Sequence, residues 1–302
     1  MEPAEGILLV DKPAGPTSHD VVVQVRKALD LRRAGHAGTL DPFATGLLIV
    51  CLGRATRLAR FIGGGTKLYE GSIRLGLSTD TDDITGRSLP ASSRGSPELL
   101  SFHRLHQAAA SLIGDQRQRP PAFSAKKIAG VPAHRRARRG QPVKLEPVFV
   151  TVHEFEIMEL DGSSARFRAL VSPGTYLRAL ARDLGEKLGI GACLESLRRL
   201  GSGPFRIEDA VPTELPAPEL ASRVIPPSRV PLGFPTLELS QEQTSKVLEG
   251  QTVLRSESTE GGEDIAVRLM DPEGRLVGIG RLFPDGQGSS IVRPEVVFHA
   301  HN

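Results

Sequence analysis

One carboxylate stands out because its neighbours in the chain can hold it still. Asp41 lies in the segment GHAGTLDPFATG, residues 35–46, whose glycines allow tight turns and a close approach of other backbone. Pro42 disfavours a helical conformation at Asp41. The apolar run 47–52 follows directly and predicts a buried strand. A carboxylate on a stiff loop beside such a strand can serve as a nucleophile or a general base, whereas a purely structural Asp-Pro turn is the alternative.

The elements around this loop follow from the hydrophobic pattern. Strands are predicted at 7–10, 47–52, 67–77, 148–160 and 165–171, the last two joined as a hairpin. Thr17 and Asp20 have the spacing of a capping box, which predicts a helix from there to about Leu29. Further helices are predicted at 56–62, up to Ile113, and from a Thr175 cap to Leu188. After a proline-rich connection at 212–235, a short helix and three strands are expected.

Charge is concentrated in one stretch of the chain. The 302 residues carry a net charge of only +3, with 24% charged and 39% hydrophobic residues, which indicates one large or two ordinary globular domains. Residues 117–144, however, contain nine Lys or Arg and no acid. A solvated face is one interpretation. Nine unopposed positive charges favour a polyanion partner instead, and a phosphate backbone is the obvious candidate.

Other patterns argue against several classes of protein. Cys51 and Cys193 are far apart and neither belongs to a CxxC pair, which is typical of a reducing compartment. The sequence shows neither a signal peptide nor an apolar run near 18 residues, so we expect a cytoplasmic protein with no membrane contact. The acidic turn 80–83 fails the calcium-loop template, because Ile84 and Ala91 fall where ligands are needed. We therefore expect no metal there.

The order G-H-x-G-x-L-D-P-x-A-T-G in residues 35–46 resembles the catalytic motif of the TruB-type tRNA pseudouridine-55 synthases. The likeness covers roughly residues 6–210. It implies an α+β fold in which a mixed or antiparallel sheet is flanked by helices, followed by a small β-rich PUA-like C-terminal domain. The domains would be 1–230, with a basic RNA-binding insertion near 117–144, and 231–302. The reaction implied is the isomerisation of a uridine in the tRNA T arm, with no cofactor and no metal.

The resemblance also implies roles for individual residues. Asp41 would be the essential catalytic residue, and Arg178 would pair with it. Tyr69 would stack on the target base and Tyr176 would lie beside that base, although packing is the plain alternative for Tyr69. The acidic turn 80–83 would lie near the active site and help to order it.

Further residues would bind or support the RNA. Lys12 and Pro13 would support the active site from behind, His36 would fill the stack vacated by the flipped base, and Leu197 would wall the uracil pocket. The segment PPAFSAKK resembles the family's RNA-gripping insertion, so RNA contacts are expected from Phe123, Lys126, Lys127, Arg135 and Arg138. The sequence departs from the family where Phe123 replaces a usual tyrosine and where an aromatic is lost near 133–134.

Three other functions are compatible with parts of this pattern. A non-catalytic RNA-binding protein or tRNA chaperone would use the basic stretch and not Asp41. A guide-RNA-dependent synthase would share the catalytic motifs, but the chain has no long basic extension at either end, which favours a monomer acting without an obligatory partner. A glycosidic hydrolase needs two flanking acids, and the Asp41 motif supplies one.

Overall fold

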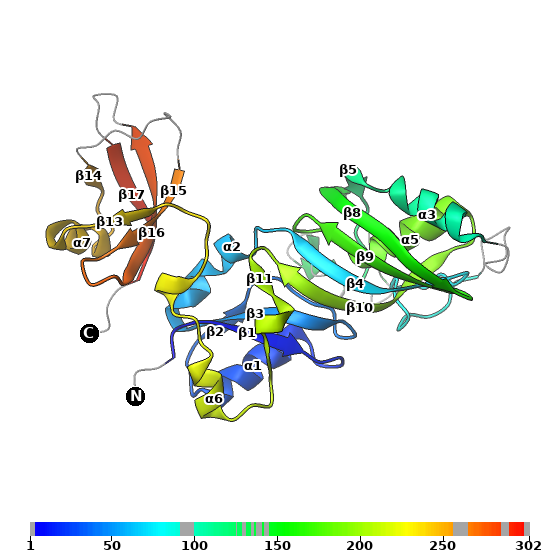
Figure 1. The fold of residues 1–302 in the computed structure, drawn as a ribbon, viewed down its shortest axis with the longest axis horizontal. Coiled ribbons are helices and arrows are strands. Elements are labelled where there is room, and N and C mark those ends of the chain that lie inside the picture. The colour runs from blue at the N-terminus through cyan, green and yellow to red at the C-terminus, as the bar shows by residue number, and fades with distance from the viewer. Residues whose placement is uncertain are drawn as a thin grey trace.

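The structure, a computed structural model, describes residues 4–90, 100–124, 126–128, 131–133, 136, 141, 145–255, 265–284 and 290–298. Within these residues the strands form a ten-stranded mixed sheet, a five-stranded sheet and a two-stranded ribbon. Figure 1 shows the large sheet at the centre and right with helices beside it, and the five-stranded sheet at the left. The expected α+β class, with a flanked sheet and a β-rich C-terminal part, is confirmed.

The large sheet has the strand order β12-β1-β3-β10-β4-β9-β8-β5, with β2 beside β3 and β11 beside β10. The parallel pairs are β1 with β12 and β3 with β10, and the other pairs are antiparallel. The strands are β1 (Gly6–Lys12), β2 (Ala34–His36), β3 (Thr45–Leu52), β4 (Lys67–Leu75), β5 (Gly114–Gln118), β8 (Val148–Asp161), β9 (Ser164–Val171), β10 (Ala192–Ser202), β11 (Phe205–Arg206) and β12 (Val211–Pro212).

The two halves of this sheet meet where β3 begins. Strand β10 pairs with β3 at Arg198 opposite Thr45 and at Arg199 opposite Gly46. This short junction lies at the end of the Asp41 loop, so the loop stands where the halves join. Any side chain at residue 46 would put its Cβ 2.3 Å from the Arg199 carbonyl oxygen, which explains the glycine.

The two faces of the sheet have different coverings. On one face, which we call the helical face, residues such as Leu8 and Leu48 pack with α1 (Ser18–Ala28), α3 (Phe102–Ala110) and α5 (Leu177–Leu188). On the other, the rear face, Ile7, Leu9 and Ile49 pack with the 3₁₀ turn η1 (Gly53–Leu58), with α2 (Ala59–Ile62) and with the C-terminal domain. This assignment follows from the alternation of side chains along each strand.

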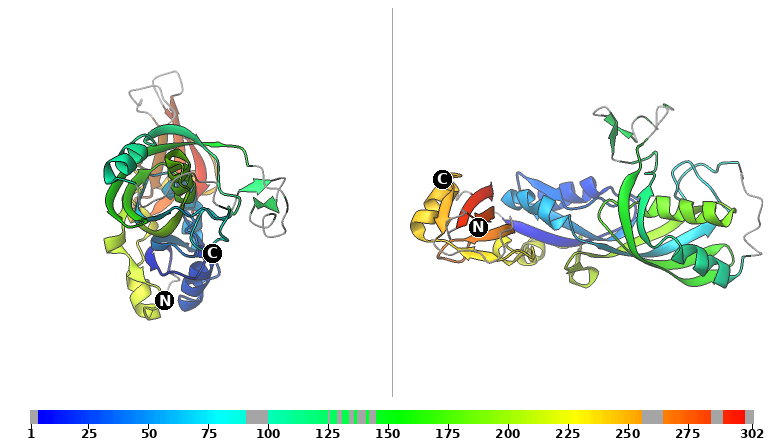
Figure 2. Two further views of the ribbon diagram at one scale, coloured as in Figure 1. Left: turned by 90° about the vertical axis from the view of Figure 1, so that its right-hand side faces the viewer. Right: turned by 90° about the horizontal axis from the view of Figure 1, so that it is seen from above.

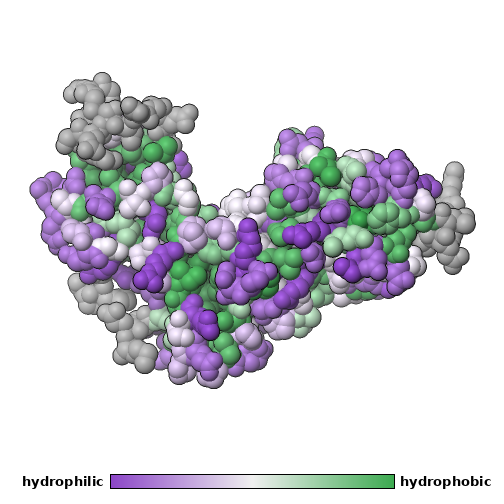
Figure 3. Space-filling model, viewed as in Figure 1, coloured by the Kyte–Doolittle hydropathy of each residue, from purple (hydrophilic) through white to green (hydrophobic). Residues whose placement is uncertain are grey.

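The C-terminal sheet has the order β13-β15-β16-β17-β14. Its elements are β13 (Thr236–Glu238), α7 (Gln241–Leu248), β14 (Val253–Arg255), β15 (Ile265–Met270), β16 (Leu276–Pro284) and β17 (Ser290–Val297). It contacts the rear face through Leu276, Ile279 and Val296. The rings of Phe61 and Phe234 also meet edge to face at 5.6 Å. In Figure 3 the outline of the molecule is hollowed between this domain and the half of the large sheet that carries β8.

Short elements complete the described chain. Between the two large parts lie η3 (Ile207–Asp209), α6 (Ala217–Ser222) and η4 (Pro227–Arg229), so the connection expected at 212–235 contains helical turns. The ribbon of β6 (Lys127–Ile128) and β7 (Val131–Pro132) stands out from the body in both views of Figure 2.

Local predictions were mostly confirmed. The Thr17–Asp20 capping box is present, and so is the hairpin of β8 and β9. The helix expected to reach Ile113 ends at Ala110, and the strand expected to reach Leu77 ends at Leu75. Arg117 belongs to β5, so the basic stretch starts on the sheet itself.

Candidate active site

The centre of the site is an ion pair between residues far apart in the chain. The Arg178 Nη2 atom donates to Asp41 Oδ1 at 3.0 Å, and Arg178 Nε lies 2.9 Å from Asp41 Oδ2. The Arg178 side chain is 6% exposed and that of Asp41 is 32% exposed. The guanidinium is therefore enclosed while the carboxylate keeps one open side, so Asp41 is oriented and still reachable.

Arg178 is itself held from several directions. Its guanidinium donates to the carbonyl oxygen of Thr81 at 3.0 Å and to that of Phe123 at 2.9 Å. Its Nη1 atom also lies 3.5 Å from a carboxylate oxygen of Asp83, which is buried. Asp83 in turn accepts from the backbone N–H of Thr85 at 3.0 Å. The acidic turn 80–83 thus forms one wall around the arginine.

Lys12, at the end of β1, is hydrogen-bonded to the backbone of the Asp41 loop. Its ammonium donates to the carbonyl oxygens of Pro42 at 3.1 Å and Ala44 at 2.7 Å, and also to that of Pro13. The side chain has no exposed surface, and burial lowers its pKa to about 8. Ser18 fixes the other side of the loop, because its hydroxyl accepts from the N–H of Leu40 and donates to the Leu40 carbonyl.

Arg199 is a third buried cation of the site, and the sequence reasoning missed it. Its guanidinium donates to the carbonyl oxygens of Leu47 at 2.7 Å, Gly38 at 3.2 Å and Thr39 at 3.4 Å. It therefore ties together the two ends of the loop that carries Asp41. A signal was available: Arg199 lies two residues after Leu197, so on a strand it must point to the same face as that buried leucine.

The register of the sheet brings these groups into one row. Lys12 lies opposite Gly46, Gly46 opposite Arg199, and Arg199 opposite Tyr69. Paired residues on neighbouring strands project to the same face, so Lys12, Arg199 and Tyr69 all lie on the helical face. Tyr69 is 7% exposed and belongs to the core there. Of this row, Lys12 and Arg199 are hydrogen-bonded to the Asp41 loop.

Burial and charge oppose each other at Asp41. Removal from solvent raises the pKa of the Asp41 carboxyl above its ordinary value, and the nearby Asp83 charge adds to the rise. Arg178 and Lys12 act in the opposite direction and favour the ionised form. The pKa of His36 is lowered by burial and by the charge of Arg199. His36 Nδ1 has no hydrogen-bond partner among the described residues.

Tyr176 occupies the N-cap of α5, one residue later than predicted. The expectation that Thr175 caps this helix is wrong: the N-cap is Tyr176, and its side chain makes no capping hydrogen bond. The N–H of Tyr176 itself donates to the side-chain oxygen of Gln118 at 2.8 Å, so β5 supplies the acceptor for the backbone of the N-cap residue. Burial raises the pKa of the Tyr176 phenol, and a hydrogen bond with Ser124 opposes that rise.

The remaining predicted residues lie in different settings. Pro13 is exposed, Leu197 is buried on β10, and the carbonyl oxygen of Leu197 accepts from Thr45 Oγ1 at 3.4 Å. Phe123 and Lys126 are half-buried, and Lys127 opens β6. Arg135 and Arg138 lie outside the described residues.

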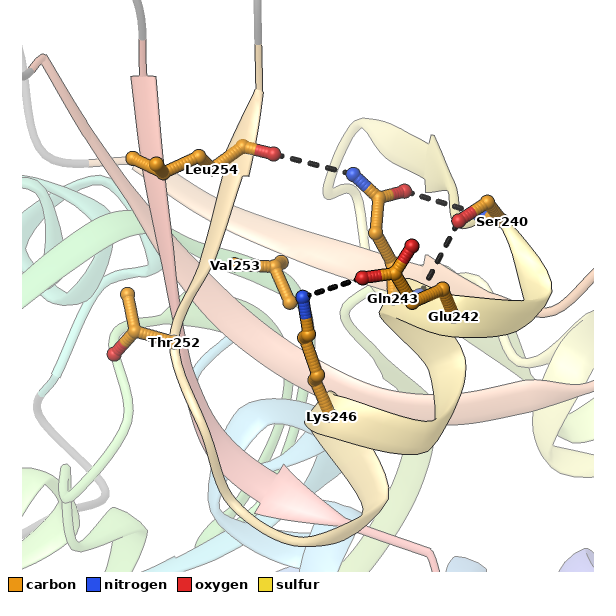
Figure 4. Close-up of a pocket in the computed structure, with 7 residues that line it drawn as sticks. All are labelled: Ser240, Glu242, Gln243, Lys246, Thr252, Val253 and Leu254. Atoms are coloured by element: carbon orange, nitrogen blue, oxygen red, sulfur yellow. Dashed lines mark hydrogen bonds and ion pairs between the residues drawn. The ribbon is translucent and has the colours of Figure 1, made fainter.

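A hollow in the C-terminal domain is unrelated to this chemistry. It lies between α7 and β14, and Figure 4 shows Glu242 turned toward Lys246 and Gln243 turned toward Leu254. Lys246 pairs with Glu242 at 2.7 Å, and the Gln243 amide donates to the Leu254 carbonyl at 3.1 Å.

Among the described residues no group of three or more His, Cys, Asp or Glu side chains could hold a metal ion. None of the described helices is long and apolar enough to cross a bilayer.

Comparison with known proteins adds three matches to family models. Residues 26–177 match the model described as TruB family pseudouridylate synthase (N terminal domain). Residues 178–215 match the tRNA pseudouridylate synthase B C-terminal domain, and residues 235–298 match Pseudouridine synthase II TruB, C-terminal.

Individual relatives agree with these models. The chain is 41% identical to the tRNA pseudouridine synthase B of Thermobifida fusca (strain YX) over 98% of this chain and 99% of that protein. It is 39% identical to the protein of the same name from Synechococcus sp. (strain WH7803), with 98% of each covered. Among solved structures it is similar to "Crystal Structure of a Cbf5-Nop10-Gar1 Complex", with TM-score 0.74, 26% identity, and 99% of this chain and 86% of that chain covered.

Proposed function

Because this chain belongs to the TruB family of pseudouridylate synthases, we propose that it converts uridine-55 in the T arm of tRNA to pseudouridine, with Asp41 as the catalytic residue. The observation that carries this proposal is the Asp41 carboxylate, gripped by the enclosed Arg178 guanidinium and open on its other side. One oriented carboxylate can act as the nucleophile or as the general base, so the isomerisation does not need a second acid.

The reaction rearranges one nucleotide without changing its composition. The bond from uracil N1 to ribose C1′ breaks, a bond from uracil C5 to C1′ forms, and the proton that C5 loses is balanced by the proton that N1 gains. Asp41 can begin this by attacking the base at C6, by attacking C1′, or by removing a sugar proton. In each case the carboxylate must be ionised, and Arg178 and Lys12 favour that state.

The target base must leave its stack to reach Asp41, at a cost of about a few kcal/mol. We propose that His36 fills the vacated position, since its ring is held neutral by burial and by Arg199. Tyr69 would stack on the extruded base, Tyr176 would lie beside it and Leu197 would wall its pocket. Lys12 and Pro13 would support the loop from behind. Phe123, Lys126, Lys127, Arg135 and Arg138 would bind the RNA backbone and T arm.

The domain organisation and context belong to the same proposal. Residues 1–230 would form the catalytic domain, with the basic RNA-binding insertion near 117–144, and residues 231–302 a PUA-like domain. The relatives of similar length are tRNA pseudouridine synthases B, which supports tRNA as the substrate. The proposal also includes a monomer that acts in the cytoplasm without a protein partner and without a cofactor. Both cysteines are free and buried, as a reducing compartment allows.

The test uses an unmodified tRNA transcript and pure protein, with no added metal, nucleotide or second RNA. We expect the wild-type protein to form pseudouridine at one T-arm position, and the Asp41→Asn variant to bind the transcript normally and form none. Product mapping and an equilibrium binding assay measure the two outcomes. A wild-type protein that binds tRNA and makes no product would support an RNA chaperone, and activity that appears only with a guide RNA would support the guide-dependent class.

A further inference from the structure

The connection between the basic segment and the Asp41–Arg178 pair passes through one buried amide. We propose that Gln118 is a positioning residue, which aligns Arg178 by holding the first turn of α5 and links that turn to the segment that grips the RNA. This inference rests on the proposed function, since it deepens the account of the same site.

The side-chain amide of Gln118 bonds both backbone polar groups of one residue, Tyr176. Its side-chain oxygen accepts from the N–H of Tyr176 at 2.8 Å, and its side-chain nitrogen donates to the carbonyl oxygen of Tyr176 at 3.2 Å. Gln118 is 1% exposed, so these bonds face no competition from solvent. Arg178 is only two residues further along. A shift of the Tyr176 backbone would therefore move the base of the guanidinium side chain directly.

The start of α5 depends on this outside support. The first N–H groups of a helix need acceptors from elsewhere. Here Tyr176 is the N-cap and makes no side-chain capping bond, and the first turn contains no acidic residue. By contrast α1 and α7 have complete capping boxes from Thr17 and Ser240. In contrast to α1 and α7, the N-cap residue of α5 therefore takes the acceptor for its N–H from a distant element, strand β5.

The residues that follow Gln118 are tied to the same helix. Arg182 Nη2 donates to the carbonyl oxygen of Arg119 at 2.9 Å, and Arg178 Nη2 donates to that of Phe123 at 2.9 Å. Ser124 also interacts with the Tyr176 phenol. Segment 118–124 and the first turns of α5 therefore move together. RNA bound by the basic stretch of residues 117–144 would act on the Asp41–Arg178 geometry through these bonds.

The experiment compares two glutamines of β5. The Gln118→Met variant keeps the size of the side chain and removes both bonds to Tyr176. The Gln116→Met variant is the matched control, because the Gln116 side chain donates to the Leu112 carbonyl at 3.0 Å and, among the described residues, has no hydrogen bond to α5. The Gln118→Glu variant restores the acceptor for the Tyr176 N–H. Single-turnover rates with saturating enzyme, the enzyme concentration at half saturation, and the pH profile of the rate are measured on tRNA, and circular dichroism verifies folding.

We expect Gln118→Met to lower the saturated rate by about ten- to a hundredfold, as a small misplacement of a catalytic group does, with half saturation changed less than about threefold. Gln118→Glu should recover part of the rate and Gln116→Met should match the wild type. The acidic limb of the rate profile should move to higher pH in Gln118→Met, because Asp41, which faces Arg178, Lys12 and Asp83, would lose the alignment of Arg178 that lowers its pKa.

Three results would overturn the inference. One is a Gln118→Met rate and acidic limb equal to those of the wild type. Another is an equal loss in Gln118→Met and Gln116→Met, which would mean a general effect on β5. The third is a loss confined to melting temperature. If Gln118→Met does not fold, Gln118→Glu carries the same comparison. An inactive wild-type protein would instead count against the proposed function, so the two failures are distinguishable.

Discussion

The two faces of the large sheet are built from alternate residues of the same strands, yet they differ in kind. On the rear face, Ile7, Leu9 and Ile49 form an apolar layer against the C-terminal domain. On the helical face, the same strands bury Lys12, and the adjoining β10 buries Arg199. Both cations donate hydrogen bonds to carbonyl oxygens of the Asp41 loop and its flanks.

This difference separates stability from positioning. Apolar burial is non-directional and stabilises the fold in proportion to the area removed from water. Buried ammonium and guanidinium groups cost desolvation energy, but their hydrogen bonds have fixed directions. We infer that the rear face mainly stabilises the fold and that the helical face uses some of that stability to hold one loop in one shape.

The largest expected effect comes from the ion pair at the centre of the site. Arg178→Ala should lower the single-turnover rate by about a thousandfold or more, equivalent to about 4 kcal/mol, because Asp41 and Asp83 lose their shared partner. Binding of tRNA, measured by fluorescence titration, should stay nearly unchanged.

The control for this variant is Arg198→Ala. Arg198 makes a two-point ion pair with Asp11 at 3.0 and 2.7 Å, but both side chains are more than a third exposed, at 43% and 35%. Exposed pairs contribute about 0–1 kcal/mol, so its rate should stay within about threefold of the wild type. Weak tRNA binding with a normal rate in Arg178→Ala would contradict the assignment of Arg178.

A pair of neighbouring core residues sharpens the comparison between faces. Ile49 on the rear face and Leu48 on the helical face are both fully buried. Each truncation to alanine should lower the free energy of unfolding by about 2–5 kcal/mol, as measured by urea denaturation. Only Leu48→Ala should also slow the folded enzyme, by about tenfold, since it lies under the site. An equal loss of rate in both variants would remove the distinction between the faces.

Much of this arrangement could be predicted from the sequence, and the reason is local. The capping box at Thr17, the buried run at 47–52 and the family likeness of residues 35–46 are all contiguous patterns, and the family membership is confirmed. Arg199 and Gln118 were missed because their partners are backbone atoms of loops and helices elsewhere in the chain. Nothing near Gln118 in the sequence indicates that it bonds the backbone of Tyr176, 58 residues away.

The wrong cap at Thr175 has the same origin. Thr175 is a residue type common at N-caps, but the N-cap is Tyr176 and the helix begins at Leu177. The backbone of Tyr176 is bonded to Gln118 on β5, a partner that the local sequence does not reveal. The roles proposed for Tyr69, His36 and Leu197 stay predictions, since they depend on an RNA that would enter the site.

A smaller effect is expected from Arg199→Lys. A lysine keeps the positive charge but cannot reach the three carbonyl oxygens that the guanidinium fork spans. The single-turnover rate should fall by about tenfold, equivalent to about 1.4 kcal/mol, with tRNA affinity unchanged. A full rate in this variant would mean that the charge alone supports the loop and that the directions of the bonds are unimportant.

The most specific effect concerns two buried lysines. Burial lowers the pKa of Lys12 to about 8 and likewise that of Lys67 to about 8, from 10.5 in the unfolded chain. Between these values the folded protein binds fewer protons than the unfolded chain, so each lysine makes the free energy of unfolding rise with pH in that window. Replacing either by methionine should flatten the rise between about pH 8 and 10.5.

The two lysines should differ in catalysis. Lys67 donates to the carbonyl oxygens of Gly63 and Gly65, away from the Asp41 loop, whereas Lys12 donates to Pro42 and Ala44 within it. We therefore expect Lys67→Met to change the pH dependence of urea denaturation and to leave the single-turnover rate near that of the wild type. Lys12→Met should change both. If the two variants lose rate equally, a buried cation on the helical face supports catalysis through the stability of that face, and the directed bonds from Lys12 to the loop are not the cause.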